Sequence, residues 1–251
     1  MRTILIVGIG AGNPDFLTLQ AISAIRRADV VFLPDKGEEK SGLNALRLRI
    51  LDHAAPGNRC RTVAFRSPAR PAQAPVYQEG IAGWREALVA SYRQLFAASL
   101  AENETGAFLV WGDPSLYDGT LAALAELQAS GMSIAIETIP GISAVQALAA
   151  AHRIPLNRIG EPVTVTTGRR VAAGEADRLS SFVVMLDSHA GWERFAGEPA
   201  EIYWGAYLGT PDELLVAGPV AEVKDEIARL RSAARARHGW IMDTYLIRRP
   251  T

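Results

Sequence analysis

The feature that most constrains the fold is an alternation of short β-branched runs with longer helical segments. In the first half of the chain, strand-like runs stand at residues 4–7, 30–33, 107–111 and 134–136. Apolar residues recur at helical spacing over about 18–27 and 77–102, and a shorter helix is predicted over 44–51. This alternation predicts an α/β fold with largely parallel strands.

The second half repeats the alternation less regularly. Strands are predicted near residues 163–166, 183–186, 202–206 and 240–247. A helix over about 221–237 precedes the last strand, and a helix rich in small residues over 143–151 follows a Pro-Gly turn. We therefore predict two α/β domains, residues 1–140 and 141–251.

Composition narrows the classes of function. Lys and Arg number 26 against 27 Asp and Glu, so no overall positive field would attract nucleic acid or an anionic membrane. No run approaches the roughly 18 apolar residues of a membrane span, and the N-terminal apolar run ends in glycines too early for a signal peptide. A cytoplasmic protein is the expectation.

The sequence predicts neither a metal site nor a hydrolytic triad. Cys60 is the single cysteine, which excludes an intramolecular disulfide and a cysteine-based metal cluster. The four histidines are scattered without the spacing of metal ligands. Neither a G-x-S-x-G elbow nor a Walker loop is present.

The stretch VGIGAGNPDFLT, residues 7–18, resembles a dinucleotide-binding fingerprint without completing it. Gly8 and Gly10 fit, but Asn13 stands where the third glycine is required. A tight turn with positive φ angles is at least as good an interpretation as a phosphate cradle.

Two further turns follow predicted strands and lead into predicted helices. In WGDPSLYDG, Asp113 can accept hydrogen bonds from a ribose or amino group, or cap backbone amides, and both interpretations stand. In TIPGISA, Ser143 is a good N-cap. If their two strands are neighbours, the two turns form a cleft at the carboxyl edge of the sheet.

A long segment over 35–76 is rich in Pro, Gly and Arg, and is predicted to be a functional flap. Arg59, Arg61, Arg66 and Arg70 form a local basic cluster in it. A solvated face is the simpler interpretation of this cluster. Binding of a polyanionic substrate is the sharper one, because arginine suits bidentate contact with carboxylates.

In order and spacing, VGIGAGNPDFLTLQAISAIRRADVV, WGDPSLYDG and IPGISAVQALAAAHRIPL resemble the S-adenosylmethionine-dependent tetrapyrrole methylases. The resemblance implies two α/β domains with the methyl donor in the cleft between them, S-adenosylhomocysteine as product and a homodimer. The segments VVFLPDKGEEKSGLNALRLRIL and DTYLIRR are similar to members that methylate carbon 1 of precorrin-5, with loss of acetate, in aerobic cobalamin biosynthesis.

The same resemblance implies site residues. The implied donor contacts are Ala11, Gly112, Asp113, Leu116, Ser143, Ala144, Met185, Leu186, Leu208 and Met242. Asp35 and Tyr117 are candidate bases, and Arg59, Arg61 and Arg66 are the candidate partners of the carboxylates on the macrocycle. Alternatives are another precorrin methylase, an RNA or protein methylase of the same fold, and a ligand-binding protein without turnover.

Overall fold

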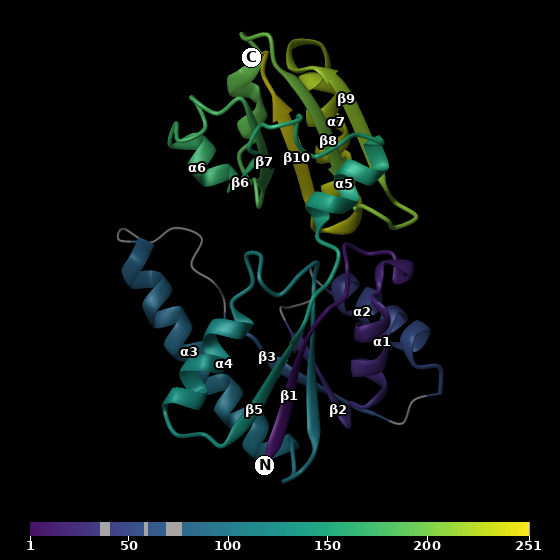
Figure 1. Cartoon of the computed structure of the whole chain (residues 1–251), viewed down its shortest axis with the longest axis vertical. Helices are drawn as coiled ribbons and strands as arrows, with labels where there is room; N and C mark the ends of the chain where they lie inside the picture. Colours follow the sequence, from purple (N-terminus) through teal and green to yellow (C-terminus); the bar gives the residue numbers. More distant parts are fainter. Residues whose placement is uncertain (36–40, 58–59, 69–76, 251) are drawn as a thin grey trace. The chain divides into compact units, whose positions relative to one another are not determined.

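The structure is a computed structural model that describes residues 1–35, 41–57, 60–68 and 77–250. The chain divides into two compact units, Met1–Ile142 and Ser143–Thr251, and each unit contains its own sheet (Figure 1). The boundary between domains that the sequence predicts lies after residue 140, two residues before this division.

The described residues of the first unit form a five-stranded parallel sheet in the order β3-β2-β4-β1-β5. Its strands are β1 (Arg2–Gly8), β2 (Val30–Asp35), β3 (Arg61–Arg66), β4 (Thr105–Val110) and β5 (Ile134–Ile139). Its helices are α1 (Leu19–Arg26), α2 (Ser41–Ala54), α3 (Tyr77–Ser99) and α4 (Thr120–Ala129), with a short 3-10 helix over Pro14–Phe16.

Both faces of this sheet are buried. Leu5 and Val7 belong to the core beneath α1 and α2, and Ile4 and Ile6 belong to the core beneath α3 and α4 (Figure 1). All four side chains are fully buried. Because successive side chains of a strand point to opposite faces, an uninterrupted apolar run is what a doubly covered strand requires.

The second unit has a mixed sheet in the order β6-β7-β10-β8-β9. Its strands are β6 (Thr164–Thr167), β7 (Ser181–Met185), β8 (Glu201–Ala206), β9 (Leu214–Pro219) and β10 (Asp243–Arg248). Its helices are α5 (Ala144–His152), α6 (Gly168–Ala172) and α7 (Val220–His238), with a 3-10 helix over Gly191–Phe195.

The prediction of largely parallel strands is wrong for this second sheet. β6 and β7 pair in parallel, whereas β10 is antiparallel to β7 and β8, and β8 is antiparallel to β9. A short loop joins β8 to β9, and so short a connection between neighbouring strands forces an antiparallel pair. The alternation of helical and strand runs gives a parallel crossover at β6-α6-β7, but β8, β9 and β10 pair antiparallel.

Two strands were missed by the sequence analysis. β3 lies inside the segment predicted to be a flap, and it has one buried side chain, Phe65. As an edge strand with arginine at both ends it lacks the apolar run of a central strand. β9 is the edge strand of the second sheet and is also largely exposed.

Candidate functional site

Three turns, at Gly8, Gly112 and Gly141, meet at the carboxyl edge of the first sheet through backbone contacts. A Cβ atom built on Gly141 would lie 2.2 Å from the carbonyl oxygen of Gly112 and 2.8 Å from Cα of Gly8. The amide of Gly112 donates to the carbonyl of Gly10 at 2.8 Å. Since real Cβ atoms do not approach backbone this closely, Gly8 and Gly141 require glycine.

The sequence predicts a cleft between the Gly112 and Gly141 turns on the condition that the strands before them are neighbours, and they are not. β4 and β5 are not neighbours, because β1 lies between them in the sheet. The Gly112 and Gly141 turns nevertheless reach each other, because Gly8 ends β1 without a side chain between them.

Asp113 braces two of these turns. Its Oδ2 accepts a hydrogen bond from the Gly141 amide at 2.8 Å, and its Oδ1 accepts from the amide of Ser115 at 2.8 Å and from the Ser115 hydroxyl. Partial burial acts to raise the pKa of Asp113, but these hydrogen bonds outweigh it and hold the pKa below its usual value. The carboxylate therefore caps backbone amides, which is one of the two interpretations that the sequence left open.

The N-terminal glycine loop does not lead into a helix in the manner of a dinucleotide site. Gly10 has a φ of 78°, and Asn13 accepts a hydrogen bond from the amide of Asp15 at the start of the 3-10 helix. The first α-helix begins only at Leu19, where Thr18 caps it by accepting from the Ala21 amide. The loop therefore lacks the helix N-terminus that binds pyrophosphate in that motif.

Three other predicted residues of the first unit lie at or beyond the carboxyl ends of strands: Asp35, Arg66 and Tyr117. Asp35 is the last residue of β2, and it is the register neighbour of Arg66 on β3. Tyr117, seven residues past the end of β4, is left-handed with a φ of 56° and is 41% exposed. Left-handed backbone at a bulky residue is strained and concentrates at functional loops.

The structure does not bring all the predicted arginines together. Arg61 lies at the opposite, amino end of β3, where its guanidinium contacts both carboxylate oxygens of Glu104 at 2.7 and 2.8 Å. Arg59 and Arg70 lie outside the described residues. Arg66 is the predicted arginine that stands at the carboxyl edge.

The predicted residues of the second unit gather at one edge of its sheet. β7 and β8 both run antiparallel to β10, so Met185 and Leu186 at the exit of β7, Leu208 after β8 and Met242 share an edge. Met242 precedes β10 instead of lying on it, and its carbonyl accepts from the Tyr207 amide at 3.0 Å. Leu186 is left-handed with a φ of 54° and is 59% exposed.

Ser143 and Ala144 stand at the start of α5. The Ser143 hydroxyl accepts from the Val145 amide at 3.1 Å, so Ser143 is the N-cap that the sequence predicted. The side chain of Ser143 is buried, whereas Ala144 is partly exposed.

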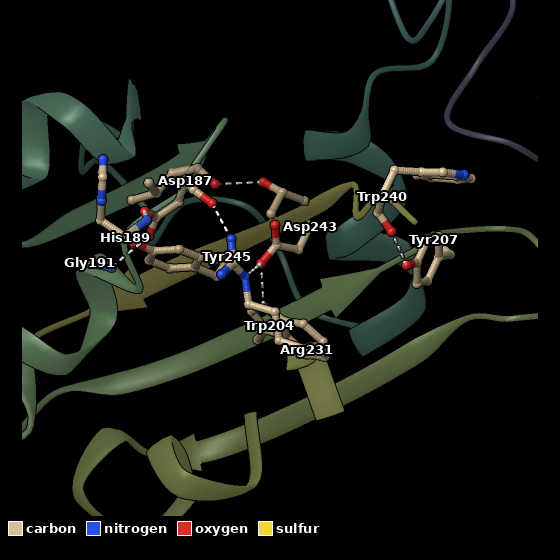
Figure 2. Close-up of polar contacts among 11 residues, drawn as sticks. Asp187, His189, Gly191, Trp204, Tyr207, Arg231, Trp240, Asp243 and Tyr245 are labelled. Atoms are coloured by element: carbon tan, nitrogen blue, oxygen red, sulfur yellow. Dashed lines mark hydrogen bonds and ion pairs between the residues drawn. The ribbon is translucent and has the colours of Figure 1, made fainter. Parts of the chain in front are cut away.

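A buried polar network behind this edge was missed by the sequence analysis (Figure 2). The carboxylate of Asp187 accepts from the Tyr245 hydroxyl and the Gly191 amide, and Asp243 accepts from Arg231 and Trp204. The available signal was position, because Asp187 and Asp243 each directly follow a predicted donor contact.

Other kinds of site find no support among the residues that the structure describes. No three His, Cys, Asp or Glu side chains there are grouped so that they could hold a metal ion. None of the helices in that part of the chain has both the length and the apolar character needed to cross a membrane.

Glycine turns stand at the edge of one sheet, and apolar strand ends stand at the edge of the other. The chain with this two-sheet fold belongs to a known class of methylating enzyme. Residues 3–224 match the family model of the tetrapyrrole (corrin/porphyrin) methylases, and the chain belongs to this family.

Within it, the chain is 47% identical over 250 residues to a precorrin-6A synthase (deacetylating) of a Sinorhizobium species, covering 99% of this chain and 96% of that one. It is 40% identical, with a TM-score of 0.82, to a cobalamin synthesis related protein (CobF) of Corynebacterium diphtheriae, covering 99% of this chain and 98% of the other.

A more distant structure shares the fold. The uroporphyrin-III C-methyl transferase of Thermus thermophilus, solved in complex with S-adenyl homocysteine, is 18% identical with a TM-score of 0.62. The alignment covers 98% of this chain and 92% of that chain.

Proposed function

We propose that the protein is an S-adenosylmethionine-dependent C-methyltransferase that methylates carbon 1 of precorrin-5, with loss of acetate, to give precorrin-6A in aerobic cobalamin biosynthesis. The observation that carries this proposal is the 47% identity to a precorrin-6A synthase (deacetylating) across 99% of the chain. We propose the residues at the two edges described above as the contacts of the methyl donor.

The residues at both edges fit S-adenosylmethionine. In the first unit the proposed contacts are Ala11, Gly112, Asp113 and Leu116, where closely packed glycines bring the turns together without side chains between them. In the second unit they are Ser143, Ala144, Met185, Leu186, Leu208 and Met242, which combine apolar side chains with strand-end peptide groups. The adenine ring of the donor has apolar faces and polar edges, and a site that combines apolar side chains with peptide groups binds both.

The donor supplies an electrophilic methyl group, and the protein's part is to hold the two reactants in line at near-attack distance. No covalent protein intermediate is required, because the electron-rich macrocycle is the nucleophile. We propose Asp35 and Tyr117 as candidates for the group that removes a proton or activates water for deacetylation. We propose that Arg66 contacts a carboxylate of the macrocycle, and its position beside Asp35 at the same strand ends supports this.

The proposal is tested by incubating the purified chain with precorrin-5 and methyl-labelled S-adenosylmethionine. One labelled methyl group in the tetrapyrrole, together with one equivalent of acetate, is the expected result. A precorrin of another methylation state serves as the control substrate and is expected to stay unlabelled. An unmodified precorrin-5 pool, or label only in the control, would contradict the assignment.

We also propose that the protein acts in the cytoplasm as a homodimer, as the family resemblance implies. Light scattering on the eluting protein then gives twice the chain mass of 27.0 kDa. A mass equal to that of one chain would contradict the dimer.

A further inference from the structure

Arg231 on α7 is a largely buried arginine outside the proposed contacts, and it bonds to two separate segments of the second unit. Its Nε donates to Oδ2 of Asp243 at 2.8 Å, and a terminal nitrogen donates to the backbone carbonyl of Asp187. Its side chain is 13% exposed and that of Asp243 is 4% exposed. The guanidinium also lies over the ring of Trp192, 5.6 Å from the centroid, which leaves it few other orientations.

The two partners of Arg231 belong to the two strand ends that carry proposed donor contacts. Asp187 comes directly after Leu186 at the exit of β7, and Asp243 comes directly after Met242 at the start of β10. Figure 2 shows the guanidinium between these two aspartates. The side chain of Arg231 therefore connects two backbone segments that are far apart in the sequence.

The third strand end is tied to the same group. Nε1 of Trp204 on β8 donates to Oδ2 of Asp243 at 3.1 Å, so Asp243 receives hydrogen bonds from two elements. Beyond β8, the Tyr207 amide donates to the carbonyl of Met242 at 3.0 Å. The exit of β8, which leads to Leu208, is thus linked to Met242 and through Asp243 to Arg231.

The turn at Leu186 needs such support. Leu186 is left-handed, a conformation that costs a bulky residue free energy, and its side chain is largely exposed. The Asp187 carboxylate fixes the following turn by accepting from the His189 amide at 2.8 Å, the Gly191 amide at 2.7 Å and the Tyr245 hydroxyl at 2.8 Å. Arg231 donates to the backbone carbonyl of Asp187.

We propose that Arg231 is a positioning residue for the methyl donor, because it fixes the separation of the Leu186 and Met242 strand ends before the donor binds. This inference rests on the proposed function, since it assumes that these strand ends contact S-adenosylmethionine. Arg231 does not touch the donor itself. Its effect is to reduce the ordering that the binding of the donor would otherwise require.

The test compares Arg231→Lys and Arg231→Gln with Arg229→Gln, a change of an exposed arginine on the same helix. Lysine keeps the charge but has a single nitrogen, so it can reach Asp243 or the Asp187 carbonyl, and not both in the geometry of the fork. The measurements are the Kd of S-adenosylhomocysteine by calorimetry, and KM for donor and for tetrapyrrole separately.

For Arg231→Lys we expect about a tenfold weaker Kd for S-adenosylhomocysteine and a matching rise in donor KM, with the tetrapyrrole KM unchanged. Arg231→Gln weakens donor binding further, and Arg229→Gln leaves all three constants at wild-type values. In a double-mutant cycle with Asp243→Asn, the losses of affinity are expected not to add, because both changes break one connection.

Donor affinity equal to wild type in folded Arg231 variants would overturn the inference, and so would equal losses for donor and tetrapyrrole, which indicate a purely structural role. Failure of the wild-type protein to bind S-adenosylhomocysteine would instead contradict the proposed function, and the inference with it. The titration of the wild-type protein alone therefore distinguishes a failure of this inference from a failure of the proposed function.

Discussion

At the scale of single residues, the meeting of Gly8, Gly112 and Gly141 is the most demanding feature of the first unit. A methyl group on Gly141 would stand 2.2 Å from a carbonyl oxygen, and backbone on both sides leaves it no room to shift. We expect Gly141→Ala to lower the free energy of unfolding by about 1–3 kcal/mol and to weaken donor binding, because the turns must separate.

The matched control is Gly83→Ala. Gly83 lies in α3 with no atom within 4 Å of an added Cβ, and alanine is the better helix former, so stability is expected to be unchanged or slightly higher. Urea unfolding of both variants and calorimetry with S-adenosylhomocysteine make the comparison. Equal stability of the two variants would show that the three turns tolerate separation.

Asp113 gives a prediction about pH. Its pKa is lowered in the folded state, so it stabilises the fold fully above the usual aspartate pKa, and this contribution is lost as the pH falls through the folded pKa. Asp113→Asn replaces one acceptor oxygen by a donor that faces another donor, which is expected to cost about 1–3 kcal/mol at neutral pH. The difference in unfolding free energy between wild type and variant should shrink in acid. A difference that is constant with pH would contradict this account.

At the scale of elements, β3 separates two arginines that are similar in sequence context. Arg61 and Arg66 stand at opposite ends of the strand, about 16 Å apart at the usual rise of a strand. We expect Arg66→Ala to raise the KM for the tetrapyrrole about tenfold, as for loss of one charged hydrogen bond, with donor KM unchanged. Arg61→Ala is the control and should change neither constant, because its partner is Glu104. The reverse pattern would place the macrocycle at the other edge.

At the scale of the whole molecule, each unit has its own core. Ile227 on α7 is fully buried in the core of the second unit, and Leu124 on α4 is fully buried in that of the first. Ile227→Ala is expected to cost the second unit about 2–5 kcal/mol. Hydrogen exchange should then speed up at amides of β8 and stay slow at amides of β1, and Leu124→Ala should give the opposite pattern. Equal loss of protection in both sheets would mean that the chain unfolds as one unit.

Much of the fold could be read from local patterns. The runs 4–7 and 30–33 became central strands because they are apolar at every position, and Ser143 caps α5 as its residue type suggests. β3 escaped because an edge strand buries little, so RTVAFR has no continuous apolar signal. The direction of β10 escaped because a strand pattern carries no information about which neighbour it pairs with or in which sense.

The sequence by itself determined the alternation of elements, the positions of the glycine turns and the membership of the family, because propensity, spacing and motif are local properties of the chain. Tertiary structure alone decided that Asp113 accepts a hydrogen bond from Gly141 and that Arg61 and Arg66 lie at opposite edges of the sheet. It also decided that Arg231 joins two strand ends, which are 44 and 12 residues away in sequence. Each of these depends on which segments pair or pack with each other, as β3 does with β2, and this is set only when the buried faces of helices and sheets pack together.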